Sequence, residues 1–189
     1  MRKERCNWAE VSDLDREYHD NEWGVPVYSD HELFEYLTLE GAQAGLSWST
    51  ILKKREGYRL LFDGFDLQKI IQYDQDKVES LMQDSRIIRN RLKINSVITN
   101  ANAFIKIQQE FGSFSNYLWS YVDQKPIINH WEVMSDVPAT TELSDKLSKD
   151  LKKRGFKFVG STICYAFLQA TGVVNDHLVN CPCYVKNNK

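Results

Sequence analysis

The chain of 189 residues is 42% hydrophobic and 26% charged and has only 4 prolines and 9 glycines, a composition typical of a soluble globular protein. This excludes collagen-like, disordered and low-complexity chains, and the longest apolar run, at 163–168, is far too short to cross a bilayer. The net charge of −2 alone neither indicates nor excludes a nucleic-acid partner. Acidic residues, not an apolar stretch, follow the basic N-terminus, so we expect no secretory signal, a cytoplasmic location and reduced cysteines.

Apolar residues recur at helical spacing along the chain, whereas strand-like alternation never lasts more than a few residues. A capping-box pattern at 29–32 opens the first clear helix, and Ser47 begins a second helix that runs toward Leu61. Further helices are expected at about 66–72, 75–83, 87–108, 114–122 and 143–154, and a last one from 161 to an end at Gly172. The segment 123–140, with two prolines, is predicted to be an irregular connection. The sequence therefore predicts an all-α protein with one domain over residues 1–189.

Glu40 lies on the apolar stripe of the first of these helices, three residues after Leu37 and four before Ala44. A carboxylate on a buried helix face is costly unless it is paired or used, which makes Glu40 a candidate functional residue. Alternatively the helix frays before Gly41 and Glu40 reaches solvent. The aromatic residues Trp8, Tyr18, Trp23 and Trp48 cluster in the same part of the chain. Such residues are most often core, and we expect this of Trp23, but beside a buried acid they also suit a pocket for a cationic planar base.

Basic residues gather in three short segments. Segments 53–59 and 84–93 each carry a net charge of +3, segment 146–157 carries +5, and the remainder of the chain sums to −13. If the three segments meet on one face, the protein presents a cationic surface despite its acidic balance. Alternatively, each segment is only the solvated face of a helix. Within the helix expected at 87–108, we expect Arg86, Arg89 and Lys93 to share one face.

The segment 143–172 predicts two helices joined by a turn that contains Gly155 and Gly160. Glycines let a backbone approach a ligand closely, and the free N–H groups at the start of a helix suit a phosphate. The N–H groups would come from Gly155, Gly160, Ser161 and Thr162, with Lys153 just before the turn. The pattern is similar to the helix-hairpin-helix motif that grips a DNA backbone, although four residues separate its glycines where one is usual. An ordinary helical hairpin with a lysine-rich surface is the alternative.

Four possible metal ligands lie near the two ends of the chain: Cys6 and His19 at one end, and His177 and Cys181 at the other. His177 and Cys181 are four residues apart and point the same way on a helical turn. Two cysteines and two histidines suit a tetrahedral structural Zn²⁺, although this spacing matches no zinc finger. Cys183 is a possible substitute for Cys181. We expect Cys164 to be a buried thiol, and His31 and His130 to lie on the surface.

Several segments, in order along nearly the whole chain, closely resemble the bacterial 3-methyladenine DNA glycosylase I family. These segments are 18–26, 39–48, 52–55, 152–160 and 175–177 with Cys181. The resemblance implies a helix-hairpin-helix fold and a monofunctional enzyme that flips N3-methyladenine out of double-stranded DNA and hydrolyses its N-glycosidic bond. The products would be the free base and an abasic site.

The resemblance also implies roles for individual residues. Cys6, His19, His177 and Cys181 would hold one structural zinc ion that joins the two terminal segments. The catalytic residue would be Glu40, and the base would contact Tyr18 and Trp48, with Trp8 at the pocket edge. Gln43, Gly45 and Leu46 would enter the duplex where the base has left. Asp15 stands where some family members have a tyrosine, and Asp176 lies near the position at which related glycosylases carry a catalytic aspartate.

The expected partners are therefore DNA containing alkylated adenine and the released base, with no membrane, and we expect a monomer. Two other functions are compatible with the sequence. A non-catalytic DNA-binding adaptor would explain the hairpin and the basic segments but would leave Glu40 unused. A glycosylase for other alkylated or deaminated purines would use the same scaffold with an altered pocket.

Overall fold

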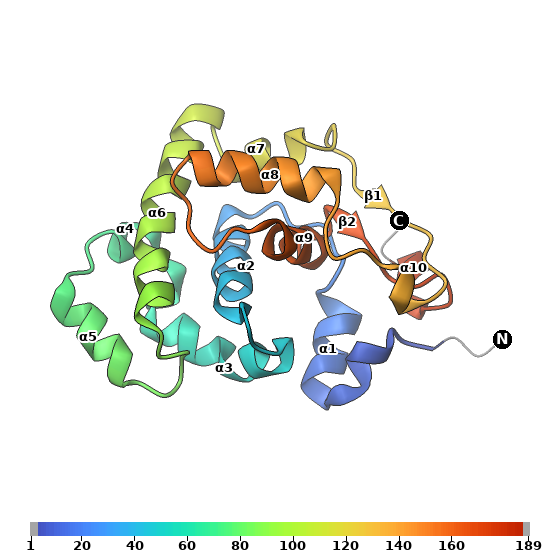
Figure 1. Cartoon of the computed structure of the whole chain (residues 1–189), viewed down its shortest axis with the longest axis horizontal. Helices are drawn as coiled ribbons and strands as arrows, with labels where there is room; N and C mark the ends of the chain where they lie inside the picture. Colours follow the sequence, from blue (N-terminus) through green and yellow to red (C-terminus); the bar gives the residue numbers. More distant parts are fainter. Residues whose placement is uncertain (1–3, 187–189) are drawn as a thin grey trace.

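The computed structural model describes residues 4–186, and most of them are helical (Figure 1). The described residues form ten α-helices and three short 3₁₀-helices. The α-helices are α1 (Asp13–Asn21), α2 (Asp30–Gln43), α3 (Trp48–Leu61), α4 (Leu67–Ile70), α5 (Gln75–Gln83), α6 (Arg91–Phe111), α7 (Phe114–Ser120), α8 (Glu142–Lys153), α9 (Ser161–Ala170) and α10 (Pro182–Lys186). The 3₁₀-helices are η1 (Asn7–Val11), η2 (Asp63–Phe65) and η3 (Met134–Asp136).

The helices that position the site begin where the sequence offers a side-chain cap. Ser12, Ser29 and Ser47 accept hydrogen bonds from backbone N–H groups in the first turns of α1, α2 and α3. Each serine satisfies one of the N–H groups that a helix start leaves without an intrahelical partner. The predicted starts at Ser29 and Ser47 are confirmed, and α2 continues past Gly41 without fraying.

Helix α2 is the central element of the molecule, and α3, α6, α7 and α9 pack around it (Figure 1). Its residues from Leu33 to Ala42 are all buried, so that it has almost no solvated face. A helix that is buried on all sides must satisfy or use the polar side chains that it carries. Two of these are glutamates, Glu35 and Glu40.

Two expectations about local structure were wrong. Helix α6 begins at Arg91, capped by Asn90, so Arg86 and Arg89 precede it and share no helix face with Lys93. The side chain of Asp84 draws Arg86 into a local turn instead.

The segment 123–140 is not wholly irregular, because it contains the short strand β1 (Ile127–Ile128). This strand pairs in parallel with β2 (Val174–Asn175), with Ile127 opposite Val174. Two residues are too few to show strand periodicity in a sequence. The pairing ties the connection before α8 to the segment after α9, where the C-terminal candidate ligands begin.

Both ends of the described chain lie on the same side of the molecule, next to α1 and α10 (Figure 1). Among residues 4–186, no helix is long and apolar enough to cross a membrane.

Candidate functional site

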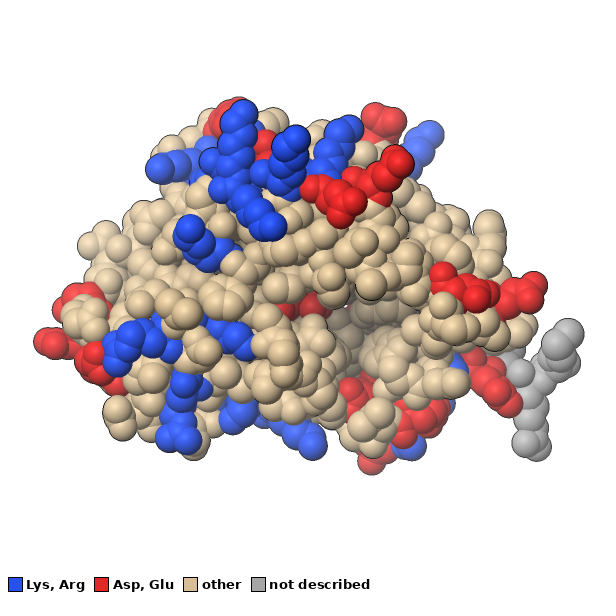
Figure 2. All heavy atoms as spheres, viewed as in Figure 1, with Lys and Arg blue, Asp and Glu red and all other residues tan. Residues whose placement is uncertain are grey.

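A cavity of about 230 Å³ opens between α1, α2, α3 and α9. In Figure 2 the surface is hollowed in this region, between α1 and α9. The cavity is lined by Trp8, Tyr18, Trp23, Glu40, Gln43, Trp48, Met134, Ala166 and Gln169. Four residues predicted to form a base pocket, Trp8, Tyr18, Glu40 and Trp48, are therefore brought together at one cavity.

Glu40 lies at the cavity from the last turns of α2 and is only 3% exposed. Within the described part of the chain its carboxyl group has neither an ion-pair partner nor a hydrogen-bond donor, and burial raises its pKa to about 8. An unpaired carboxylate is costly here, so burial favours the neutral acid. Such a group is ready to ionise when a cation arrives.

Tyr18 and Trp48 lie next to each other in the cavity wall, with ring centroids 5.3 Å apart and a tilt of 46° between the ring planes. The Tyr18 hydroxyl and the Trp48 indole N–H are buried and have no hydrogen-bond partner among the described residues. Burial also raises the pKa of Tyr18 well above its usual value, so the hydroxyl stays neutral. Buried polar groups in native proteins nearly always have a partner. Two unpartnered donors beside an unpaired acid therefore indicate a binding site for a flat, polar ligand.

Trp8 lies at the edge of this group, 6.2 Å from the Tyr18 ring and 5.1 Å from the Trp23 ring between centroids. Trp23 itself is 8% exposed, as expected of a core residue, yet it also lines the cavity. Met134, Ala166 and Gln169 also line the cavity. No sequence pattern links any of these three residues to Glu40.

Asp176 is completely buried, and its carboxylate is saturated with hydrogen bonds. It accepts from the side chains of Asn129, Trp131, Tyr165 and Gln169. A carboxylate with four donors has no lone pair left for a reacting group. An acceptor of several hydrogen bonds is needed at this position, because Asp176 joins the 123–140 connection to α9 at the wall of the cavity.

Asp15 does not line the cavity. Its carboxylate accepts hydrogen bonds from Ser12 at 2.5 Å and from Ser49 at 2.9 Å. It thereby links α1, which carries Tyr18, to the start of α3, which carries Trp48.

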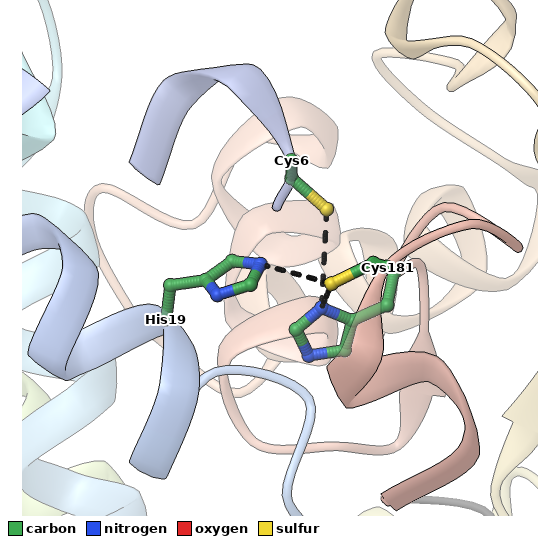
Figure 3. A group of neighbouring side chains, drawn as sticks. Cys6, His19 and Cys181 are labelled. Atoms are coloured by element: carbon green, nitrogen blue, oxygen red, sulfur yellow. Dashed lines mark hydrogen bonds between the residues drawn. The ribbon is translucent and has the colours of Figure 1, made fainter. Parts of the chain in front are cut away.

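Cys6, His19, His177 and Cys181 are all buried, and their ligand atoms lie within 4.8 Å of one another. Figure 3 shows the Cys6 and Cys181 sulfurs and the His19 ring pointing toward one another. The Cys181 sulfur lies 3.5 Å from His19 Nε2 and 3.6 Å from His177 Nδ1, and the Cys6 sulfur lies 3.9 Å from His177 Nδ1. The cluster can hold a metal ion.

The ring nitrogens of the two histidines that face away from this cluster are also engaged. His19 Nδ1 lies 2.8 Å from Asp20 Oδ1, and His177 Nε2 lies 2.9 Å from the carbonyl oxygen of Trp23. Each partner accepts a hydrogen bond from the outer ring N–H, which leaves the inner nitrogen with a free lone pair, as in histidines that bind metals.

The other cysteines and histidines lie outside this cluster. The Cys183 sulfur lies 4.0 Å from the outer nitrogen of His19, so Cys181 is the better-placed ligand. Cys164 is a buried thiol on α9, as expected. His31 and His130 are exposed, where they contact Gly64 and Tyr184.

Between α2 and α3 the chain makes a tight exposed turn. Gly45 has a φ of +79°, a left-handed conformation that favours glycine, and Leu46 N–H donates to the Gln43 carbonyl at 2.7 Å. Leu46 is 40% exposed. Gln43 lines the cavity directly, so this turn borders the entrance.

Helices α8 and α9 pack against each other and are joined by the turn 154–160. Gly155 has a φ of +93°, and a Cβ atom added at Gly155 or Gly160 would meet nothing within 4 Å. The backbone of both glycines is therefore open to a close approach. Ser161 and Thr162 form the first turn of α9, with the Ser161 hydroxyl donating to Asp145 at 2.5 Å. Since Ala166 and Gln169 of α9 line the cavity, one rigid helix connects the turn to the cavity wall.

Most arginines of the three basic segments are used in ion pairs within the protein. Arg55 contacts Glu22 at 2.7 Å and Glu35 at 2.6 Å. Similar pairs engage Arg59, Arg86, Arg91 and Arg154. The free positive charge is therefore smaller than the sequence indicated. Lysines 146–153 lie on α8, and Figure 2 shows basic side chains gathered over this helix on the same face as the hollow.

The model of the methyladenine glycosylase family matches residues 8–184. Over 184 residues the chain is 51% identical to DNA-3-methyladenine glycosylase 1 of Escherichia coli K12. The aligned region covers 97% of this chain and 98% of the Escherichia coli protein. A crystal structure of 3-methyladenine DNA glycosylase I is similar with a TM-score of 0.93 and 50% identity, covering 95% of this chain and 99% of that one. A structure on 3-methyladenine recognition by the Staphylococcus aureus enzyme has a TM-score of 0.92 and 39% identity, covering 96% and 97% of the two chains.

Proposed function

Because the chain belongs to the methyladenine glycosylase family, we propose that it is a DNA-3-methyladenine glycosylase of base-excision repair. It removes N3-methyladenine from DNA by hydrolysing the N-glycosidic bond. The observation that carries this proposal is the cavity, where the unpaired acid of Glu40 lies with two unpartnered donors, Tyr18 and Trp48. A DNA-binding adaptor would have no use for such a cavity.

The chemistry of the lesion sets what the protein must do. Methylation at N3 makes the adenine ring cationic, so its glycosidic bond is already weak and the base leaves as a neutral molecule. The enzyme need not protonate the leaving group. It must extract the nucleotide from the helix, recognise the base and expose the sugar to water.

Recognition of the extruded base is proposed to depend on charge. The aromatic faces of Tyr18 and Trp48 attract a cationic ring, and Trp8 closes the pocket edge. A cation beside Glu40 favours its ionised form, so the acid becomes a charged hydrogen-bond acceptor when the lesion is present. Ordinary adenine is neutral and brings no such gain, and its bond is strong. The pocket thus selects the damaged base.

DNA binding is proposed to use the α8–α9 hairpin as a helix-hairpin-helix motif. Gly155, Gly160, Ser161 and Thr162 offer backbone N–H groups to a phosphate, and Lys153 adds positive charge. Gln43, Gly45 and Leu46 occupy the space in the duplex that the extruded base leaves. The exposure of Leu46 and the position of the turn at the cavity entrance support this role.

We also propose that Cys6, His19, His177 and Cys181 hold one structural Zn²⁺. Around a tetrahedral zinc, sulfur and nitrogen ligands at their usual bond lengths lie about 3.5 Å apart. The sulfur–nitrogen distances of 3.5, 3.6 and 3.9 Å fit that geometry. With four protein ligands the ion has no open position for water, so its contribution is to folding.

The protein is proposed to act as a monomer of one domain in the cytoplasm, where the DNA lies.

The proposal is tested with a panel of duplexes that each carry one damaged purine, with the released bases identified by chromatography. We expect release of 3-methyladenine above all. Binding to the duplexes without release of any base would favour the adaptor. Preferential release of a deaminated purine or another alkylated purine would instead assign the scaffold to that lesion.

Replacing Leu46 with alanine is expected to weaken binding of lesion-containing duplex about 10-fold, because the gap left by the base is no longer filled. Burying a leucine side chain is worth about 1.5–3 kcal/mol, and a tenfold change in affinity corresponds to about 1.4 kcal/mol. Affinity for free 3-methyladenine should stay within about 2-fold, since the base alone leaves no gap. Duplex binding by gel shift and base binding by calorimetry measure the two quantities. Equal losses in both would place Leu46 in the pocket instead.

A further inference from the structure

Lys93 belongs to a basic segment of the sequence, yet its ammonium group points into the protein. From the first turn of α6, its Nζ donates hydrogen bonds to the carbonyl oxygens of Ala42 at 2.8 Å and Ala44 at 2.7 Å. Desolvation lowers the pKa of Lys93, which reflects its partly buried place. Ala42 and Ala44 flank Gln43 at the end of α2, just before Gly45.

The carbonyl groups at the end of a helix have no intrahelical partners and carry the negative end of the helix dipole. At the end of α2 the backbone bonds are Ala44 N–H to the Gly41 carbonyl at 3.4 Å and Leu46 N–H to the Gln43 carbonyl at 2.7 Å, and neither uses the carbonyl oxygens that Lys93 contacts. The two bonds from Lys93 cross 51 and 49 residues of sequence and fix α2 to α6 at this point. A charged donor at this end of a helix is both a cap and a cross-link.

We propose that Lys93 is a positioning residue for the turn 43–46: it fixes the backbone at both sides of Gln43, so that Gln43 and Leu46 are held in the orientation needed to fill the gap in the duplex. This inference rests on the proposed function. Lys93 differs from the lysines of α8, because two of its three donor hydrogens are used inside the protein. A phosphate contact would need those hydrogens free.

The consequence is specific to double-stranded substrate. A base in single-stranded DNA is already unpaired, so no gap must be filled when it enters the cavity. Loss of the two bonds should let the turn move and impair extraction from a duplex. The pocket itself, formed by Glu40, Tyr18 and Trp48, should keep its affinity for the base.

The test compares Lys93→Met, which keeps the length of the side chain but removes the donors, with Lys106→Met, an exposed lysine on the same helix. Excision is measured under single-turnover conditions on the same lesion in duplex and in single-stranded oligonucleotides. We expect Lys93→Met to slow duplex excision about 10-fold and single-strand excision less than about 2-fold, since bonds to a charged donor are among the stronger ones. Lys106→Met should change neither. Lys93→Arg, which retains donors, should recover part of the duplex rate.

If the wild-type protein is active, three results for Lys93→Met would overturn the inference. An unchanged duplex rate would show that the bonds do not matter, and equal losses on both substrates would indicate general destabilisation. If Lys93→Met reduces the slope of log duplex affinity against log salt concentration by about one unit, Lys93 is a phosphate contact instead. If wild-type protein releases 3-methyladenine from neither substrate, the proposed function fails, and this inference fails with it.

Discussion

Replacing Glu40 with glutamine is expected to slow release of 3-methyladenine from duplex DNA by about 10- to 100-fold. The variant keeps the size of the side chain and one acceptor oxygen but cannot ionise when the cationic base arrives. A hydrogen bond to a charged group is worth about 1.5–3 kcal/mol, and each 1.4 kcal/mol changes a rate about tenfold. The loss should be partial because the weak bond of the lesion supplies much of the driving force. Single-turnover excision at saturating enzyme measures it.

The stability of the same variant is the control. Burial raises the pKa of Glu40 from 4.5 to about 8. Between these pH values the folded protein keeps a proton that the unfolded chain has released, so this residue lowers the free energy of unfolding as pH rises through the window. Glutamine does not titrate. We therefore expect Glu40→Gln to be at least as stable as wild type at pH 6 and to gain relative stability up to about pH 8, as measured by thermal unfolding. Slow excision by a stable variant cannot then be attributed to unfolding, whereas a wild-type excision rate would make Glu40 a structural acid.

Replacing Cys6 with serine is expected to abolish binding of the proposed zinc ion and to lower the melting temperature by about 10 °C. An ion that binds the folded chain in preference to the unfolded one adds its binding energy to stability. For a chain of this length, the expected shift corresponds to about 2.5–5 kcal/mol. Elemental analysis of protein purified without chelators gives the metal content, and calorimetry gives the melting temperature.

Cys183→Ser is the matched control, since Cys183 lies beside the cluster but next to the outer nitrogen of His19. It should retain one zinc per chain. Whatever fraction of Cys6→Ser is folded should still bind free 3-methyladenine, because the cluster does not line the cavity. Wild-type protein free of zinc would refute the metal proposal.

The sequence predicted the helices around the site well because their signals are local. Serine caps and apolar spacing lie within a few residues of one another, so the starts of α2 and α3 and the burial of Glu40 were predictable. The convergence of Cys6 with His177 was suggested only weakly by spacing, and the family resemblance strengthened it. The roles of these residues remain predictions.

Features that depend on distant partners were not predictable. Arg55 looked like part of a cationic surface, but Glu22 and Glu35 neutralise it from other helices. Lys93 was assigned to the same kind of surface and instead caps α2. Periodicity does not specify which charged side chains meet across a fold, because many pairings satisfy the same local pattern. The parallel pair β1–β2 escaped detection because each strand has two residues.

The Cys/His cluster also bears on how the protein is made. Its contacts join residues separated by 171 positions, between Cys6 and His177, and by 162, between His19 and Cys181. During translation, the first two side chains leave the ribosome long before their partners are synthesised. A nascent chain that stops short of His177 lacks half of the cluster. The four side chains can therefore come together only after synthesis has passed Cys181.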